Sequence, residues 1–299
     1  MTDLDDLLLR TSRTFAMSIP LLPEPTRQEV KIAYLLFRVA DTLEDADLWG
    51  RSERIAALDA MVQLLHSPTL AADALALTQQ VRLHPPSIHQ GYVELLLALP
   101  ELMAALESLE QRARATIILH ALRTAEGMRG FVERQGDNGS LVLRDVEDLK
   151  DYCYVVAGIV GEMLTELFLL QISARADLVA RLRRHSRAFG EGLQLVNILK
   201  DAEDDHHHGR VYLPADAPRE AIFELARQDL RDAVTYIRTL QDMRAPRGIV
   251  EFNALNVRLA FATVDQVEVH GAGAKLSRAE VARIFTDLGA ALDDGRPAL

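Results

Sequence analysis

Almost every segment of the chain repeats its apolar residues at the three- and four-residue spacing of an α-helix. No stretch rich in Val, Ile and Thr alternates apolar with polar residues as a β-strand does. Short breaks separate the expected helices, which favours antiparallel neighbours. The sequence therefore predicts an all-α fold, in one domain over residues 1–299. The expected helices span residues 26–45, 52–65, 70–83, 87–100, 101–134, 146–170, 176–205, 218–243, 249–269 and 277–292.

Local signals predict where several of these helices begin and end. Thr26 followed by Glu29 is typical of a capping box at a helix start, and Ser52 is a candidate cap for the next helix. Residues 135–140 form the clearest loop, and residues 206–208, three histidines, are expected to be a polar loop. A zinc site there is disfavoured, because adjacent histidines on a helix do not share a face.

A polar stripe runs along the first long helix. Tyr34, Arg38, Asp41 and Asp45 stand at offsets of 0, 4, 7 and 11, which places them on one face of a helix. Apolar residues surround that face, so we expect a helix that is buried on most sides, with its acids turned into a cavity. Buried carboxylates are costly unless they are paired or bind a metal ion.

The second polar stripe lies on the helix expected at 176–205. Gln194, Asn197, Asp201 and Asp205 stand at offsets of 0, 3, 7 and 11, and Lys200 lies at the edge of their face. Two such helices facing each other would place about four carboxylates around one space. Divalent cations with oxygen ligands, above all Mg²⁺, suit such a set. The alternative for each cluster alone is a solvated helix end on an acidic protein.

A third segment combines tyrosine with small residues inside a helix. Tyr152 stands at its polar end, where its hydroxyl could exchange a proton with a reactive cation or be a hydrogen-bonded core group. Gly158 and Gly161 each cost helix stability of about 1 kcal/mol, so each needs a reason. Close packing of two helices is a better explanation for them than ligand contact.

Composition excludes several classes of protein. The net charge of −11 argues against nucleic-acid binding and against simple electrostatic attachment to anionic lipid. A single cysteine, Cys153, excludes an internal disulfide and suggests a reducing compartment. The start of the chain is acidic, unlike a secretory signal, and no apolar run reaches the ~18 residues of a membrane span. We expect a cytoplasmic protein, at most peripherally associated with a membrane.

Taken in order, these segments resemble the squalene/phytoene synthases, a family of head-to-head prenyltransferases. The resemblance covers residues 12–263, and the amino acids at 41–45 and at 152–158 are most similar to those of squalene synthases. It rests on five motifs: Ser12-Arg13-Thr14-Phe15; Tyr34, Arg38, Asp41, Glu44 and Asp45; residues 152–158; Gln194, Asn197, Lys200, Asp201 and Asp205; and residues 209–214.

The resemblance implies a helical bundle around a central cavity and a role for each matched residue. It implies that Mg²⁺ ions are held by Asp41, Asp45, Asn197, Asp201 and Asp205. It assigns proton handling to Tyr152 and substrate binding to Ser12, Arg13, Tyr34, Arg38, Gln194, Asn197, Lys200 and Arg210. Lys200 departs from the arginine that the family usually has, and lysine keeps the charge without the bidentate fork.

The activity that the resemblance implies is condensation of two farnesyl diphosphates, through presqualene diphosphate, to squalene. NADPH is the expected reductant, although Gly271-Ala272-Gly273 is no dinucleotide fingerprint. Dehydrosqualene or phytoene synthesis without hydride transfer is the main alternative. A terpene cyclase and a non-catalytic isoprenoid-binding protein are further alternatives. The sequence leaves substrate length, oligomeric state and membrane contact open.

Overall fold

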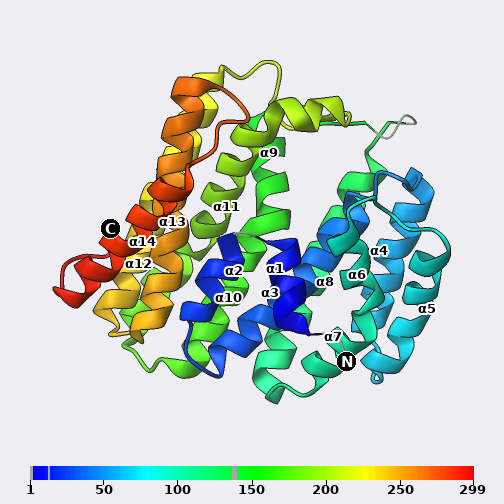
Figure 1. Ribbon diagram of the computed structural model, residues 1–299, viewed down its shortest axis with the longest axis horizontal. Helices are drawn as coiled ribbons and strands as arrows, with labels where there is room; N and C mark the ends of the chain where they lie inside the picture. The colour runs from blue at the N-terminus through cyan, green and yellow to red at the C-terminus, as the bar shows by residue number, and fades with distance from the viewer. Residues whose placement is uncertain (1–2, 13, 137–139) are drawn as a thin grey trace. The chain divides into compact units, whose positions relative to one another are not determined.

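The computed structural model describes residues 3–12, 14–136 and 140–299, and most of them are helical. The predicted all-α fold is therefore confirmed (Figure 1). The chain divides into two compact units. Unit 1 comprises Met1–Ile19 with Glu24–Gly139, and unit 2 comprises Pro20–Pro23 with Ser140–Leu299. The single domain expected from the sequence stays a prediction.

Unit 1 is built around α3. Between Val30 and Glu44 only Lys31, Tyr34, Arg38 and Asp41 escape burial. This is the apolar helix with one polar stripe that the spacing predicts. Helices α1, α4, α6, α7 and α8 all contact α3. The helices of unit 1 are α1 (Leu4–Thr11), α2 (Thr14–Ser18), α3 (Thr26–Glu44), α4 (Arg51–Leu65), α5 (Leu70–Leu83), α6 (Gln90–Leu97), α7 (Leu99–Glu107) and α8 (Gln111–Glu133).

Unit 2 is organised around its longest helix, α11, which packs against α10, α12 and α13 (Figure 1). A two-residue parallel ladder pairs Leu141 with Arg210 and Val142 with Val211. The 3₁₀ turn η1 (Ile19–Leu21) spans the boundary between the units. The elements of unit 2 are β1 (Leu141–Val142), α9 (Val146–Cys153), the π-helical turn η2 (Tyr154–Gly158), α10 (Ile159–Gln171), α11 (Ala176–His207), β2 (Arg210–Val211), α12 (Arg219–Asp242), α13 (Arg247–His270) and α14 (Arg278–Asp293).

Glycines allow α10 and α11 to approach closely. A Cβ at Gly161 would overlap the carbonyl oxygen of Ser186, and one at Gly190 would overlap that of Ala157. A Cβ at Gly158 would lie 2.8 Å from the Tyr154 ring and 3.0 Å from Glu191. The helix-packing explanation for Gly158 and Gly161 is therefore the correct one.

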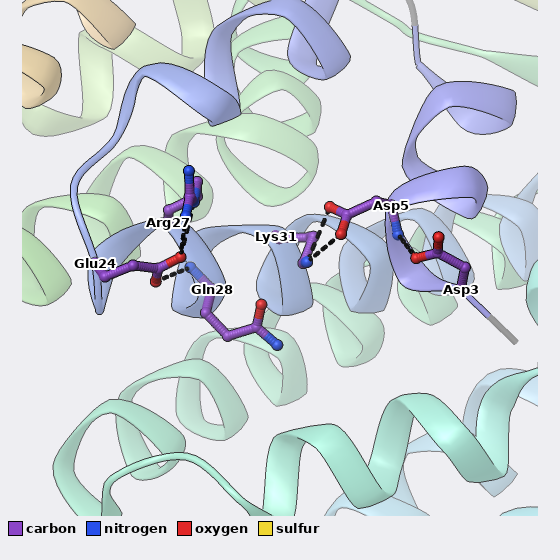
Figure 2. A network of polar contacts seen from close by, with 6 residues as sticks. All are labelled: Asp3, Asp5, Glu24, Arg27, Gln28 and Lys31. Atoms are coloured by element: carbon purple, nitrogen blue, oxygen red, sulfur yellow. Dashed lines mark hydrogen bonds and ion pairs between the residues drawn. The ribbon is translucent and has the colours of Figure 1, made fainter. Parts of the chain in front are cut away.

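Two of the predicted helix caps are wrong. Thr26 and Glu29 are buried, and the N-cap residue of α3 is Pro25. The carboxylate of Glu24 accepts from the backbone N–H of Gln28 at 3.3 Å and from Arg27 at 2.7 Å (Figure 2). Ser52 lies inside α4, which begins after Gly50. Burial of Thr26 and Glu29 thus explains the first error, and at α4 the Glu53 carboxylate accepts the Gly50 N–H, which sets the helix start before the exposed Ser52.

Three helix boundaries also differ from the prediction. The helix expected over 87–100 is two helices, because Pro100 occupies the first turn of α7 rather than the end of a helix. The helix expected over 101–134 covers most of α7 and all of α8. Helix α11 continues through His207, so the histidines expected in a loop belong largely to the helix.

One helical stretch contradicts the expectation that no segment is long and apolar enough to cross a membrane. Val146–Gln171 is continuous from α9 through α10 and contains an 18-residue window with a mean hydropathy of 1.8. The charge-free runs within it are short, which is why a search for unbroken apolar residues misses it. Half of the window is buried inside the protein, as in the core helix of a folded domain.

Candidate functional site

The polar stripe of α3 is a connected set of side chains. Arg38 lies 3.3 Å from the Asp41 carboxylate and donates to the Tyr34 hydroxyl at 3.2 Å through Nη2. The Asp45 backbone N–H donates to the Asp41 carbonyl, which makes Asp45 the C-cap of the helix. The predicted group of Tyr34, Arg38, Asp41 and Asp45 therefore occupies one face, with both acids at the C-terminal end of α3.

Burial and neighbouring charges shift the pKa values of two side chains in this stripe. Burial raises the pKa of Asp41 to about 6, against the opposing charge of Arg38 and with the help of Asp45. The pKa of Arg38 is raised. Burial alone would lower this pKa, but the interactions of the guanidinium with Asp41, Tyr34 and Tyr92 outweigh the effect of burial. Asp41 thus keeps an incompletely balanced charge beside one cation, and a further cation would stabilise it.

The N-terminal segment packs against the same stripe. Tyr34 donates to the Thr11 carbonyl at 3.1 Å, and Lys31 donates to both Asp5 oxygens at 2.9 and 3.0 Å (Figure 2). Ser12, a predicted substrate contact, ends α1, and its hydroxyl accepts the Phe15 N–H of α2 at 3.0 Å. Arg13, the neighbouring predicted contact, lies outside the described residues.

Tyr92 of α6 is a member of the stripe that sequence reasoning missed. The Arg38 guanidinium lies 5.7 Å from the Tyr92 ring centroid and 5.7 Å from that of Tyr34. Two aromatic faces therefore hold one arginine side chain. Tyr92 is far from the motif in sequence, and no local pattern marks it.

The polar stripe of α11 is the second set. Lys200 lies 3.1 Å from the Asp201 carboxylate and donates to the Asn197 side-chain oxygen at 3.4 Å. Gln194, Asp201 and Asp205 are half-buried, whereas Asn197 is exposed. The structure brings Asn197, Lys200 and Asp201 together as predicted, with a cation beside an acid, as Arg38 lies beside Asp41.

Asp205 and Arg210 border a pocket within unit 2. The pocket has a volume of about 440 Å³. The turn at Gly209 (φ +75°) ends α11 and leads into β2, which brings Arg210 and Tyr212 back beside the helix end. The lining residues are Ile198, Ala202, Glu203, Asp205, His206, His207, Arg210, Val211, Tyr212, Leu213, Arg219 and Ala272.

Tyr152 is buried beside that pocket's Tyr212. Its hydroxyl donates to the Tyr212 hydroxyl at 3.0 Å, and the two rings stack with centroids 4.7 Å apart. The hydroxyl therefore has a hydrogen-bond partner, as the core-tyrosine alternative expects. The same hydrogen bond also permits proton transfer between Tyr152 and the pocket-lining Tyr212. The role of Tyr152 in proton handling stays a prediction.

Two acids with no predicted role, the buried Glu191 and the half-buried Asp229, lie next to η2 and on α12, respectively. Arg187 covers the Tyr154 ring at 4.3 Å and donates to Glu191 at 2.5 Å. Burial raises the pKa of Glu191 to about 7 in spite of Arg187, and burial raises the pKa of Asp229 on α12 to about 6. These acids are part of the packing between α11 and its neighbours.

The carboxylate pairs suit magnesium better than zinc. Within the described residues no group of three or more His, Cys, Asp and Glu side chains is close enough to hold a metal ion. Each stripe instead offers two carboxylates one helical turn apart, Asp41 with Asp45 and Asp201 with Asp205. Mg²⁺ binds through one or two carboxylates and leaves its other positions to water and phosphate. The donor set therefore fits Mg²⁺.

Comparison with known proteins gives a consistent family. The sequence model described as squalene/phytoene synthase matches residues 8–221. A squalene synthase of Cyberlindnera jadinii is 26% identical over 209 residues, which cover 70% of this chain and 44% of that protein. A bifunctional lycopene cyclase/phytoene synthase of Colletotrichum graminicola is 30% identical over 218 residues, which cover 69% of this chain and 33% of that protein. The chain thus spans less than half the length of these curated relatives.

A solved structure extends the similarity to nearly the whole fold. The complex of TcSQS with the ligand BPH1237 superposes with a TM-score of 0.73 at 25% identity, over 97% of this chain and 87% of that one. The similarity therefore includes the C-terminal helices, which lie beyond the segment that the family model matches.

Proposed function

The chain belongs to the squalene/phytoene synthase family, and we propose that it condenses two farnesyl diphosphates head to head, through presqualene diphosphate, with release of diphosphate. Squalene is the proposed product when NADPH supplies hydride as a co-substrate. The observation that carries the proposal is that α3 and α11 each bear a carboxylate pair with a cation on the same face. Both pairs are assigned to the same reaction.

The side chains of the two stripes would bind and orient the diphosphates. The ions would be held by Asp41, Asp45, Asp201 and Asp205, with Asn197 assisting. When bound, Mg²⁺ neutralises charge on a departing diphosphate. Direct contacts to diphosphate would come from Ser12, Arg13, Arg38, Lys200 and Arg210, with Tyr34 and Gln194 bordering the site. Arg38 is well suited, because its aromatic neighbours and Asp41 fix the guanidinium before substrate arrives.

The last step of the reaction involves proton transfer or hydride transfer. Tyr152 would accept or donate a proton through the Tyr212 hydroxyl, 3.0 Å away. The residues described give no dinucleotide fold for NADPH, since Gly271 and Gly273 turn the chain after α13 with φ of 88° and 81° rather than link a strand to a helix.

Product analysis tests the reaction. The protein is incubated with Mg²⁺ and farnesyl or geranylgeranyl diphosphate, with and without NADPH, and the hydrocarbon is identified by its mass. A C30 product that requires NADPH supports squalene synthesis, and a C30 product formed without it indicates dehydrosqualene. A C40 product indicates phytoene, and a C15 product indicates a cyclase. No product with any substrate would contradict the catalytic proposal and leave an isoprenoid-binding protein.

Amide substitutions test the assignment of both carboxylate pairs to one reaction. Asp41→Asn and Asp201→Asn should each abolish turnover while helicity is unchanged. The double variant should be no worse than either single variant, because groups that act as a unit are not additive. Asp47→Asn and Asp204→Asn are matched controls, since both acids are exposed neighbours of the pairs. Near-normal activity in Asp41→Asn or Asp201→Asn would contradict the metal assignment.

A further inference from the structure

An exposed apolar surface lies where the α3–α4 loop meets the α5–α6 loop of unit 1. Leu48, Leu83 and Ile88 expose 56%, 76% and 86% of their surface, and Pro85 between the last two is also exposed. Among the large hydrophobic residues that the structure describes, Ile88 and Leu83 have the two highest exposed fractions. We refer to Leu48, Leu83, Pro85 and Ile88 as the apolar tip.

The apolar tip is held in place by hydrogen bonds beneath it. The Leu48 N–H donates to the Pro86 carbonyl at 3.1 Å, and the Trp49 indole N–H donates to the His84 carbonyl at 2.9 Å. Trp49 is 5% exposed and Pro86 is buried, so both support the tip from below. Consecutive prolines also restrict the backbone. The tip therefore presents its apolar side chains in a fixed arrangement.

The charges around the tip suit phospholipid headgroups. Residues 82–92 contain no acid in a chain with 44 of them. Arg82, His84 and His89 are all exposed on this segment. The α3–α4 loop opposite carries the exposed acids Asp45 and Asp47, which disfavour a strongly anionic surface. An apolar loop with one arginine and no acid, beside the two acids of the α3–α4 loop, is complementary to a zwitterionic interface, where Arg82 can reach a phosphate.

We propose that the apolar tip inserts into the surface of a zwitterionic phospholipid bilayer. A second copy of the chain is a poorer partner, because a stable dimer buries about 800 Å² on each side, far more than four side chains offer. Interfacial insertion needs only a few apolar residues with polar neighbours. The tip begins three residues after Asp45, so it would bring one proposed metal-binding loop to the lipid that takes up a hydrocarbon product.

Vesicle flotation with phosphatidylcholine tests the proposal on the full chain, without substrate, so its failure would leave the proposed function untouched. The wild type should float with the vesicles, and the double variant Leu83→Ser/Ile88→Ser should lose about 10-fold or more in partitioning. Leu119→Ser/Val269→Ser is the matched control, because these residues are 56% and 74% exposed elsewhere. It should bind within about 2-fold of the wild type.

Trp49 provides a direct optical readout, since it is the single tryptophan of the chain and lies under the tip. Brominated phosphatidylcholine should quench its emission in the wild type and not in the double variant. Unchanged helicity and unchanged Trp49 emission without vesicles will show that the variants are folded. The proposal is overturned if the wild type does not bind, if the double variant binds equally, or if the control loses as much. A dimer that Ile88→Ser dissociates, with no vesicle binding, would instead assign the tip to a second copy.

Discussion

The contact between α11 and η2 gives the sharpest prediction about stability. Gly190 lies against the carbonyl oxygen of Ala157, so Gly190→Ala forces a methyl group into backbone that cannot rotate away. Overpacking of this kind costs about 1–3 kcal/mol, and an obstacle made of backbone favours the upper end of that range. The gain in helix propensity returns about 1 kcal/mol. The net loss should be about 2 kcal/mol. For a folding unit of the size of unit 2, a loss of this size lowers Tm by about 4–8 °C.

Gly289→Ala is the matched control within the same unit. Gly289 is also helical, but a Cβ there would meet nothing within 4 Å. The substitution should therefore raise the free energy of unfolding by up to about 1 kcal/mol. Urea unfolding followed by far-UV circular dichroism measures both variants. If Gly190→Ala is as stable as the wild type, or if both variants shift in the same direction, the close approach of η2 to α11 is wrong.

Three further predictions concern the metal, pH and a buried hydroxyl. Chelation of divalent cations should abolish product formation and added Mg²⁺ should restore it; full activity in excess chelator would contradict the Mg²⁺ assignment. Because burial raises the pKa of Glu191 to about 7 from 4.5, its contribution to stability is present at low pH and is lost as the pH rises from 4.5 through 7. The stability of Glu191→Gln relative to the wild type should therefore increase from about pH 5 to about pH 8 in denaturant titrations, and a pH-independent difference would refute this. Tyr236 is fully buried with its hydroxyl 2.9 Å from that of Thr165, so Tyr236→Phe should cost about 1 kcal/mol in the same assay, whereas no loss would mean that this hydrogen bond adds nothing.

The two polar stripes could be predicted because they depend on periodicity alone. In α3 the polar positions 34, 38 and 41 are half-buried, while nearly all residues between them are buried. A helix fixes which residues share a face, whatever the rest of the chain does. The ion pairs Arg38–Asp41 and Lys200–Asp201 follow from the same local geometry.

The contacts that join distant segments could not be predicted in this way. Tyr92 reaches Arg38 from another helix, and Tyr152 meets Tyr212 only because β2 folds back beside α11. The expected loop at 206–208 was wrong for a different reason. Gly209 has a positive φ and ends the helix, so the signal was present one residue beyond the histidines.

The positions of the acids within their helices argue for a bound cation independently of any family. Asp41 and Asp45 stand at the C-terminal end of α3, and Asp205 stands in the last turn of α11. The helix dipole is negative there, so each carboxylate costs about 0.3–1 kcal/mol relative to a neutral position. The last turn of α3 carries no basic residue to offset that cost. All three acids oppose the helix dipole, and burial adds a cost at Asp41, as expected where function outweighs stability. In the proposed site, a divalent cation shared with a diphosphate would offset the dipole cost of these carboxylates and the burial cost of Asp41 together.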